Sequence, residues 1–220
     1  MRTLLTIAAI ALACIAATQI AEKVNLTSKQ AVGSVAKYKI AAKIADQFEI
    51  KGTVECKVSK IDKGAPTEID WKCTEFVQSM DGTAGPEGPP PALLAKVDKF
   101  GLPETLDVKE NGAVYVAIAI ASYHPEKELG IGDTFKIDWK GKNDGGVMTG
   151  TGALKEIKTE GGLKIAVLKS NIQMTPAGQS SPADLEITSE FNLADGTLIK
   201  STLKGTISEG DFFCTVTLVK

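Results

Sequence analysis

The chain lacks the residues on which most catalytic sites depend. Its 220 residues include a single histidine, His124, which precedes Pro125 in a predicted loop. A zinc site needs three or four ligands, and Ser/His/Asp catalysis needs a histidine beside a nucleophile. No such partners stand at a suitable spacing from His124, and no Gly-x-Ser-x-Gly motif occurs. The sequence therefore predicts neither a catalytic residue nor a metal site, and we expect a protein that is not an enzyme.

The chain also has no excess of basic residues. Lysine and arginine together number 25, against 27 acidic residues, and the net charge is -2. Nothing resembles the basic stripe of a nucleic-acid-binding face, so no nucleic-acid partner is expected.

The glycines do not form a cofactor-binding loop. Those at 145, 146, 150 and 152 do not lead from a strand into a helix, which argues against phosphate binding. Residues 142–146 lack the regular acidic spacing of a calcium loop. No cofactor is therefore predicted. Gly150 and Gly152 share one strand face and indicate a bend, or something packed closely over the sheet.

The N-terminal segment has the pattern of an export signal. Residues 1–3 include Arg2, and residues 4–17 are almost wholly Ala, Ile and Leu. We assign residues 1–21 to a signal peptide cleaved near position 17. A retained membrane anchor is the alternative, although the run is short for a span of ~20 residues. Cys14, after Ala-Leu-Ala, resembles the lipidated cysteine of a bacterial lipobox.

This segment sets the expected location. We expect export to the periplasm or cell envelope of a bacterium, with membrane contact only through the signal or a lipid anchor. The sequence does not indicate an oligomeric state.

Residues 22–220 are predicted to form a single β-rich domain. In residues 36–44 the apolar side chains alternate with lysines, which is the period of a half-buried strand. Folding this strand against residue 48 onward sets Lys43 opposite Glu49 and Lys37 opposite Glu55. The expected fold is all-β with minor helix: one large curved antiparallel sheet, or a half-open barrel, of about nine to eleven strands with a short helical cover.

Two cysteines stand on the hairpin formed by residues 48–77. A fold about Gly64-Ala65 sets Cys56 opposite Cys73 and Val58 opposite Trp71, within reach of a disulfide. The same register sets Lys57 against Lys72, two like charges. Both a Cys56–Cys73 bridge and two buried thiols remain open at this point. Cys214, on the apolar face of the last strand, is expected to be a buried thiol.

Three segments in the middle of the chain are predicted as follows. Residues 91–97 form one or two helical turns that begin at a proline. Asn111-Gly112 forms a tight hairpin between residues 105–109 and 113–116. Residues 117–123 form either a buried strand or a short buried helix.

The second half of the chain reads as a series of hairpins. A Gly-rich loop at residues 130–133 leads into a strand with Phe135, Ile137 and Trp139 inside. Residues 147–157 and 163–174 flank the turn at 160–162. The loop at 194–196 sets acids opposite bases and apolar residues opposite apolar residues; the expected pairs are Phe191 with Ile199, Ile187 with Leu203, Glu190 with Lys200 and Glu186 with Lys204.

These features resemble a family of exported bacterial proteins known only as a domain of unknown function. The likeness is carried by the signal segment, Asn111-Gly112, Pro125, residues 129–135 and Asp195-Gly196. Where that family has tryptophan after Gly-Asp-x, this chain has Phe135. The family has no established catalytic residues, so the resemblance implies none here. A looser architectural likeness, to periplasmic lipoprotein carriers, implies a curved sheet that cradles an acyl chain.

Two functions are compatible with this pattern. The first is an exported binding protein that holds a lipid or other hydrophobic small molecule in the concave face of the sheet. Candidate ligand-lining residues are Tyr38, Ile40, Val54 and Trp71. The second is a structural or interaction protein of the cell envelope with a filled core. The volume and lining of the largest interior pocket distinguish the two.

Overall fold

The computed structural model describes residues 22–85, 88–105 and 108–219, without the side chains of 108–111. Its main feature is an 11-stranded sheet with the order β5-β4-β3-β2-β13-β12-β11-β10-β9-β8, in which β6 also pairs with β4. All the pairings are antiparallel. The strands are β2 (Val35–Ile44), β3 (Phe48–Asp62), β4 (Ala65–Met80), β5 (Thr83–Ala84), β6 (Leu93–Lys96), β8 (Thr134–Lys140), β9 (Gly146–Glu160), β10 (Leu163–Pro176), β11 (Ala183–Asn192), β12 (Leu198–Ile207) and β13 (Gly210–Leu218).

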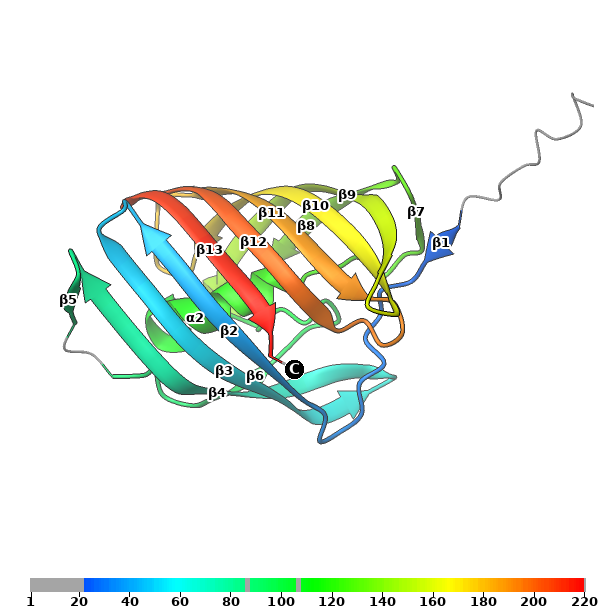
Figure 1. Cartoon of the computed structure of the whole chain (residues 1–220), viewed down its shortest axis with the longest axis horizontal. Helices are drawn as coiled ribbons and strands as arrows, with labels where there is room; N and C mark the ends of the chain where they lie inside the picture. The colour runs from blue at the N-terminus through cyan, green and yellow to red at the C-terminus, as the bar shows by residue number, and fades with distance from the viewer. Residues whose placement is uncertain (1–21, 86–87, 106–107, 220) are drawn as a thin grey trace, which may run out of the picture.

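The sheet is curved and does not close into a barrel, and the helix α2 (Val108–Ala121) lies against its concave face (Figure 1). The predicted fold class is therefore confirmed. The curvature is accompanied by close packing at one predicted glycine. A Cβ atom on Gly152 would lie 2.2 Å from the ring of Phe135 on β8, so only glycine leaves room for that ring.

Alternation decides which side chains enter the core. Along β8 every second residue is buried, and these are Phe135, Ile137 and Trp139, as predicted. The β2–β3 pairing also follows the prediction. Lys43 lies opposite Glu49 with 2.9 Å between their charged groups, and Lys37 lies opposite Glu55 at 3.2 Å. These ion pairs belong to the convex face, because neighbouring residues such as Ala42 point into the core.

The open choice for Cys56 and Cys73 is resolved as two free thiols, and the candidate disulfide is not formed. Cys56 lies opposite Trp71 and Cys73 lies opposite Val54, so the register differs by two residues from the predicted one. Val58 accordingly lies opposite Ile69. All three cysteines in the described residues are free thiols.

Charge explains this register. The chain turns at Lys63-Gly64, with Asp62 paired to Ala65. Lys57 then faces Asp70 and Glu55 faces Lys72, so each acid meets a base. A shift of two residues leaves every side chain on its predicted face, which is why the alternation alone did not reveal it.

The predicted hairpin at Asn111-Gly112 is wrong. This dipeptide lies inside α2, where Gly112 adopts the non-helical angles φ 69° and ψ 140°. Every residue from Val114 to Ala121 is buried. A helix that is apolar on all sides is stable only inside a core, and the concave sheet provides that surrounding. The open choice for residues 117–123 is resolved as helix as far as Ala121.

Two smaller predictions also fail. Residues 93–96 form the strand β6 against β4 rather than helical turns, because the edge of β4 supplies hydrogen-bonding partners for an extended segment. In the β11–β12 hairpin, Phe191 pairs with Leu198 instead of Ile199, because a register shift follows Glu190. The other three predicted pairs of this hairpin are confirmed.

Residues 22–34, which we call the strap, cross one end of the concave side (Figure 1). Their strand β1 (Lys23–Val24) pairs with β7 (Leu129–Gly130) in a separate small sheet. Leu26 is only 1% exposed, so the strap contributes to the core. Among the described residues no helix is long and apolar enough to cross a membrane.

Candidate ligand-binding cleft

The two larger cavities on the concave side lie towards opposite ends of α2. The first, which we call the α2 cleft, is bordered by the beginning of the helix at Ala113 and Val114. The second, the strap cavity, is bordered by the end of the helix at Ala119 and Ser122 and by the strap.

The α2 cleft has a volume of about 270 Å³. An engineered apolar cavity of about 150 Å³ stays dry and binds benzene, so this volume is large enough for a hydrocarbon group. The lining is almost entirely apolar. It comprises Ile40, Ala42, Ile44, Ile50, Ala113, Val114, Val116, Ala117, Ile120, Met174, Pro176, Gln179, Ser181, Ala183, Leu185, Leu203, Ile207, Ser208, Glu209, Phe212 and Cys214.

The cleft exists because short side chains face one another across it. Ala113 and Ala117 lie on the helix, while Ala42 and Ala183 lie on the strands. An alanine extends only one carbon from the backbone, so the space between helix and sheet stays unfilled at this end. Longer side chains at the same positions would restore the close packing of an ordinary protein interior.

The mouth of the cleft is polar. Gln179, Ser181, Ser208 and Glu209 are the exposed polar residues among those that line it. They come from the β10–β11 connection and the β12–β13 turn, which lie at the same end of the antiparallel sheet. An amphiphilic ligand could therefore keep its polar head at the rim while its chain is buried.

The interior of the cleft offers no activated nucleophile. Cys214 is fully buried there, and desolvation raises the pKa of its thiol to about 12. The thiol is neutral at physiological pH, and a neutral thiol is a poor nucleophile. The cysteine acts as a small apolar residue of the wall.

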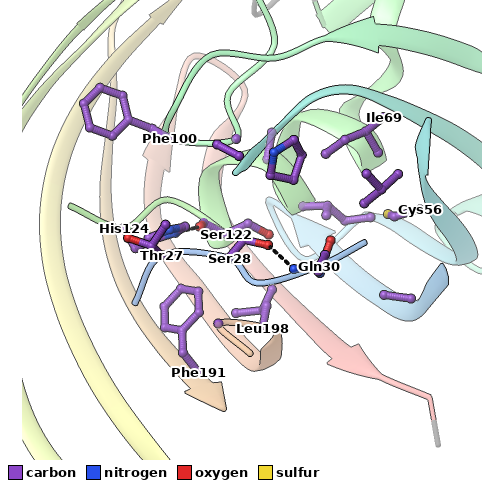
Figure 2. Close-up of a pocket in the computed structure, with 18 of the residues that line it drawn as sticks. Thr27, Ser28, Gln30, Cys56, Ile69, Phe100, Ser122, His124, Phe191 and Leu198 are labelled. Carbon is purple, nitrogen blue, oxygen red and sulfur yellow. Dashed lines mark hydrogen bonds between the residues drawn. The ribbon is translucent and has the colours of Figure 1, made fainter. Parts of the chain in front are cut away.

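The strap cavity is smaller, about 100 Å³, and mixes polar with apolar groups. Figure 2 shows Thr27 and Ser28 of the strap close to His124 and Phe191. The His124 ring meets the Phe191 ring edge-on, with 5.8 Å between their centres. Its Nδ1 atom lies 3.0 Å from the carbonyl oxygen of Ser122, so Nδ1 carries the proton and donates.

Desolvation lowers the pKa of His124, more than the Ser122 carbonyl and nearby carboxylates raise it. The imidazole is therefore neutral at physiological pH. The described residues contain no cluster of three or more potential metal ligands, so His124 belongs to no such cluster among them.

The four candidate lining residues are separated. Ile40 lines the α2 cleft, whereas Tyr38 and Trp71 line the strap cavity, and Val54 is fully buried. Tyr115 of α2 accounts for part of this separation, since its ring lies 5.6 Å from that of Trp71. The helix thus occupies the space in which a single tunnel past all four residues would lie.

The cysteine candidates have different outcomes. Cys14 lies outside the described residues. Cys56 lines the strap cavity, and burial raises the pKa of both the Cys56 and the Cys73 thiols. Neither is activated for exchange.

The sequence did not identify most of the cleft. The sequence pattern places Ala113 and Val116 in a hairpin strand and leaves Ala117 open between a strand and a helix. The available signal was a continuous apolar run of nine residues, Ala113 to Ala121, which is just longer than the 4–8 residues of a typical buried strand.

Comparisons with known proteins identify no family. No family model matches the chain, and no curated protein matches it. Among solved structures, a "putative lipoprotein" from Parabacteroides distasonis is 12% identical with a TM-score of 0.38, covering 90% of this chain and 98% of that one. The hypothetical lipoprotein YmcC from Escherichia coli is 15% identical with a TM-score of 0.34, covering 87% of this chain and 89% of that one. At this level of similarity no shared role follows.

Proposed function

We propose that this protein is an exported, non-enzymatic binding protein that holds a hydrophobic ligand in the α2 cleft. The observation that supports it is an apolar cleft of about 270 Å³ between helix and sheet, with a polar mouth. Drug-sized ligands occupy pockets of about 300–1,000 Å³, so this cleft suits a single hydrocarbon chain rather than a multi-chain lipid.

The first experiment recovers a native ligand. The exported protein is purified from its own cells without detergent, extracted with organic solvent and analysed by mass spectrometry. A hydrocarbon-chain compound at near-stoichiometric yield is expected. An empty extract, together with no binding of an environment-sensitive fluorescent probe, would overturn the proposal.

A pair of neighbouring substitutions locates the site. Ala42 points into the cleft and Ala41 points to the convex surface. Ala42→Phe should fill the cleft and reduce probe binding at least tenfold, while Ala41→Phe should leave it unchanged. Equal binding by both variants would place the ligand elsewhere.

The second candidate is a structural envelope protein with a filled core. It is favoured by the packing around the rest of α2, where Trp71, Tyr115 and Val54 are almost wholly buried. Under this candidate Ala42→Phe stabilises the protein by filling a void, no ligand is recovered, and the cellular role survives the substitution.

Export rests on residues 1–21, which lie outside the described residues. Cell fractionation should find the protein in the periplasm or envelope. Replacement of Cys14 by Ser separates the two versions of this proposal, because only a lipidated protein would move from the membrane to the soluble fraction.

A further inference from the structure

The mouth of the α2 cleft has an unbalanced charge. Among the described residues that line the cleft, Glu209 is the only one that is charged at neutral pH. Its neighbours at the rim, Gln179, Ser181 and Ser208, are neutral groups that donate and accept hydrogen bonds.

Lysines of the flanking strands do not face the cleft. Lys43 follows Ala42 on β2, but it points to the convex face and pairs with Glu49 at 2.9 Å. Lys204 follows Leu203 on β12, and it pairs with Glu186 at 2.9 Å. Both cations are therefore committed to carboxylates on the opposite side of the sheet from the cleft.

The three connections that flank the cleft at this end of the sheet are also without cations, and Lys142 of the β8–β9 connection at the same end pairs with Glu104. The segments 45–47, 177–182 and 208–209 contain Asp46 and Glu209 but no lysine or arginine. A ligand with a carboxylate or phosphate head would bring its charge to a rim that repels it. Fatty acids and phospholipids are thus poor matches.

The start of α2 argues against a fully cationic head as well. Ala113 and Val114 border the cleft where the helix resumes after Gly112. The first turn of a helix carries roughly half a positive charge from its backbone dipoles. That partial charge offsets some of the field of Glu209, and an uncharged head with hydrogen-bonding groups is the best match to both.

We propose, resting on the function proposed above, that the ligand is a single-chain amphiphile with an uncharged polar head. A glyceryl ester is the representative chemistry. Its chain occupies the apolar cleft, and its hydroxyl and carbonyl groups bond to the rim formed by Gln179, Ser181, Ser208 and Glu209.

The test compares three probes of equal chain length: 1-decanoylglycerol, decanoate and decyltrimethylammonium. Each is titrated calorimetrically into the exported full chain at neutral pH and low ionic strength, below its micelle concentration. The glyceryl ester should bind tightest, with decanoate weaker by about tenfold or more. Glu209→Gln should reduce this difference in affinity by strengthening decanoate binding. Asp62→Asn, the same charge change at the opposite end of the sheet, should not narrow it.

The outcomes separate this inference from the function on which it rests. Decanoate or the ammonium probe binding as tightly as the glyceryl ester would overturn the uncharged head, while binding in the cleft would stand. The uncharged head would also be overturned if Glu209→Gln left the difference in affinity between the glyceryl ester and decanoate unchanged. If no probe binds, both proposals fail.

Discussion

The indole Nε1 atom of Trp139 donates a hydrogen bond of 2.8 Å to the carboxylate of Asp98, which lies 41 residues earlier in the chain. Asp98 also accepts from the backbone N–H groups of Phe100 and Leu102. One carboxylate thus shapes the turn after β6 and fastens it to β8. β6 pairs with β4 near one end of the strand order, and β8 lies at the other end. This bond therefore joins two parts of the sheet that do not pair with each other.

This bond should contribute measurably to stability. We expect a double-mutant cycle of Trp139→Phe and Asp98→Asn to give a coupling free energy of about 1.5–3 kcal/mol, the range for hydrogen bonds to a charged group. Urea unfolding of the four proteins measures it. The cycle is needed because Trp139→Phe also removes buried ring volume. A coupling near zero would mean that the two residues contribute independently.

Asp98 should also give the protein a specific pH dependence. Desolvation raises the pKa of its carboxyl above the ordinary value of 3.8, more than its hydrogen bonds lower it. The native state therefore binds a proton more readily than the unfolded state, and the stability contributed by protonation is present at low pH and lost as pH rises through the native pKa.

The measurement compares wild type with Asp98→Asn, which cannot titrate. As pH falls towards 3.8, wild type should gain stability relative to the variant. A difference in unfolding free energy that does not change over this interval would contradict the raised pKa.

His124 should reduce the stability of the protein as pH falls, whereas Asp98 raises it, and it should do so in a higher pH interval. Burial lowers its pKa below 6.5, so the unfolded state binds the proton more readily. Stability from this residue is present above pH 6.5 and is lost as pH falls below 6.5 through the lower native pKa. The chain has a single histidine, so it is the group whose ordinary pKa lies in this interval.

We expect wild type to lose stability between pH 7 and pH 5.5 in thermal unfolding, and His124→Gln to lose less. Glu126 and Asp98 are the nearby acids that oppose the effect. If the unfolding temperatures of the two proteins changed with pH in parallel, the pKa of His124 would be the same in the folded and unfolded states, against this prediction.

Alternation along strands allowed much of the sheet to be predicted. Ala42 and Lys43 show why, since each was placed on its correct face by the period of two. That period also limits prediction, because a register slip of two residues, such as the one that separates Cys56 from Cys73, changes no face. Only the charges of Lys57 and Lys72 opposed the predicted register.

The cleft could not be predicted in the same way. Its helix is buried on all sides, and a uniformly apolar run has no polar position to reveal a period of 3.6 residues. The Asn-Gly pair ahead of it is a strong hairpin signal, yet Gly112 serves here as a non-helical residue within α2. The packing of Val114 to Ala121 against a distant sheet outweighed that local preference.

The hydroxyl of Tyr115 joins this helix to the sheet. It accepts a hydrogen bond from the backbone N–H of Cys73 at 3.0 Å and donates one to the carbonyl of Pro91 at 3.1 Å. Tyr115→Phe would leave the buried N–H of Cys73 without this partner, at a cost of about 1–3 kcal/mol. Tyr123→Phe is the matched control, because burial rather than hydrogen bonding dominates the surroundings of that hydroxyl. Equal losses in urea unfolding would show that the Tyr115 hydroxyl has no special role.

The thiols provide the last prediction. Residues 22–220 contain three free cysteines, Cys56, Cys73 and Cys214, so the denatured, unreduced protein should react with three equivalents of iodoacetamide. In the native protein the reaction should be slow, since burial raises all three pKa values. Mass spectrometry counts the adducts.

A count of one would mean a Cys56–Cys73 bridge, which requires β4 to slip two residues and to set Lys57 against Lys72. That slip replaces two opposite-charge pairs, Lys57–Asp70 and Glu55–Lys72, with one like-charge pair, and for this reason we expect the thiols to stay free even in an oxidising compartment.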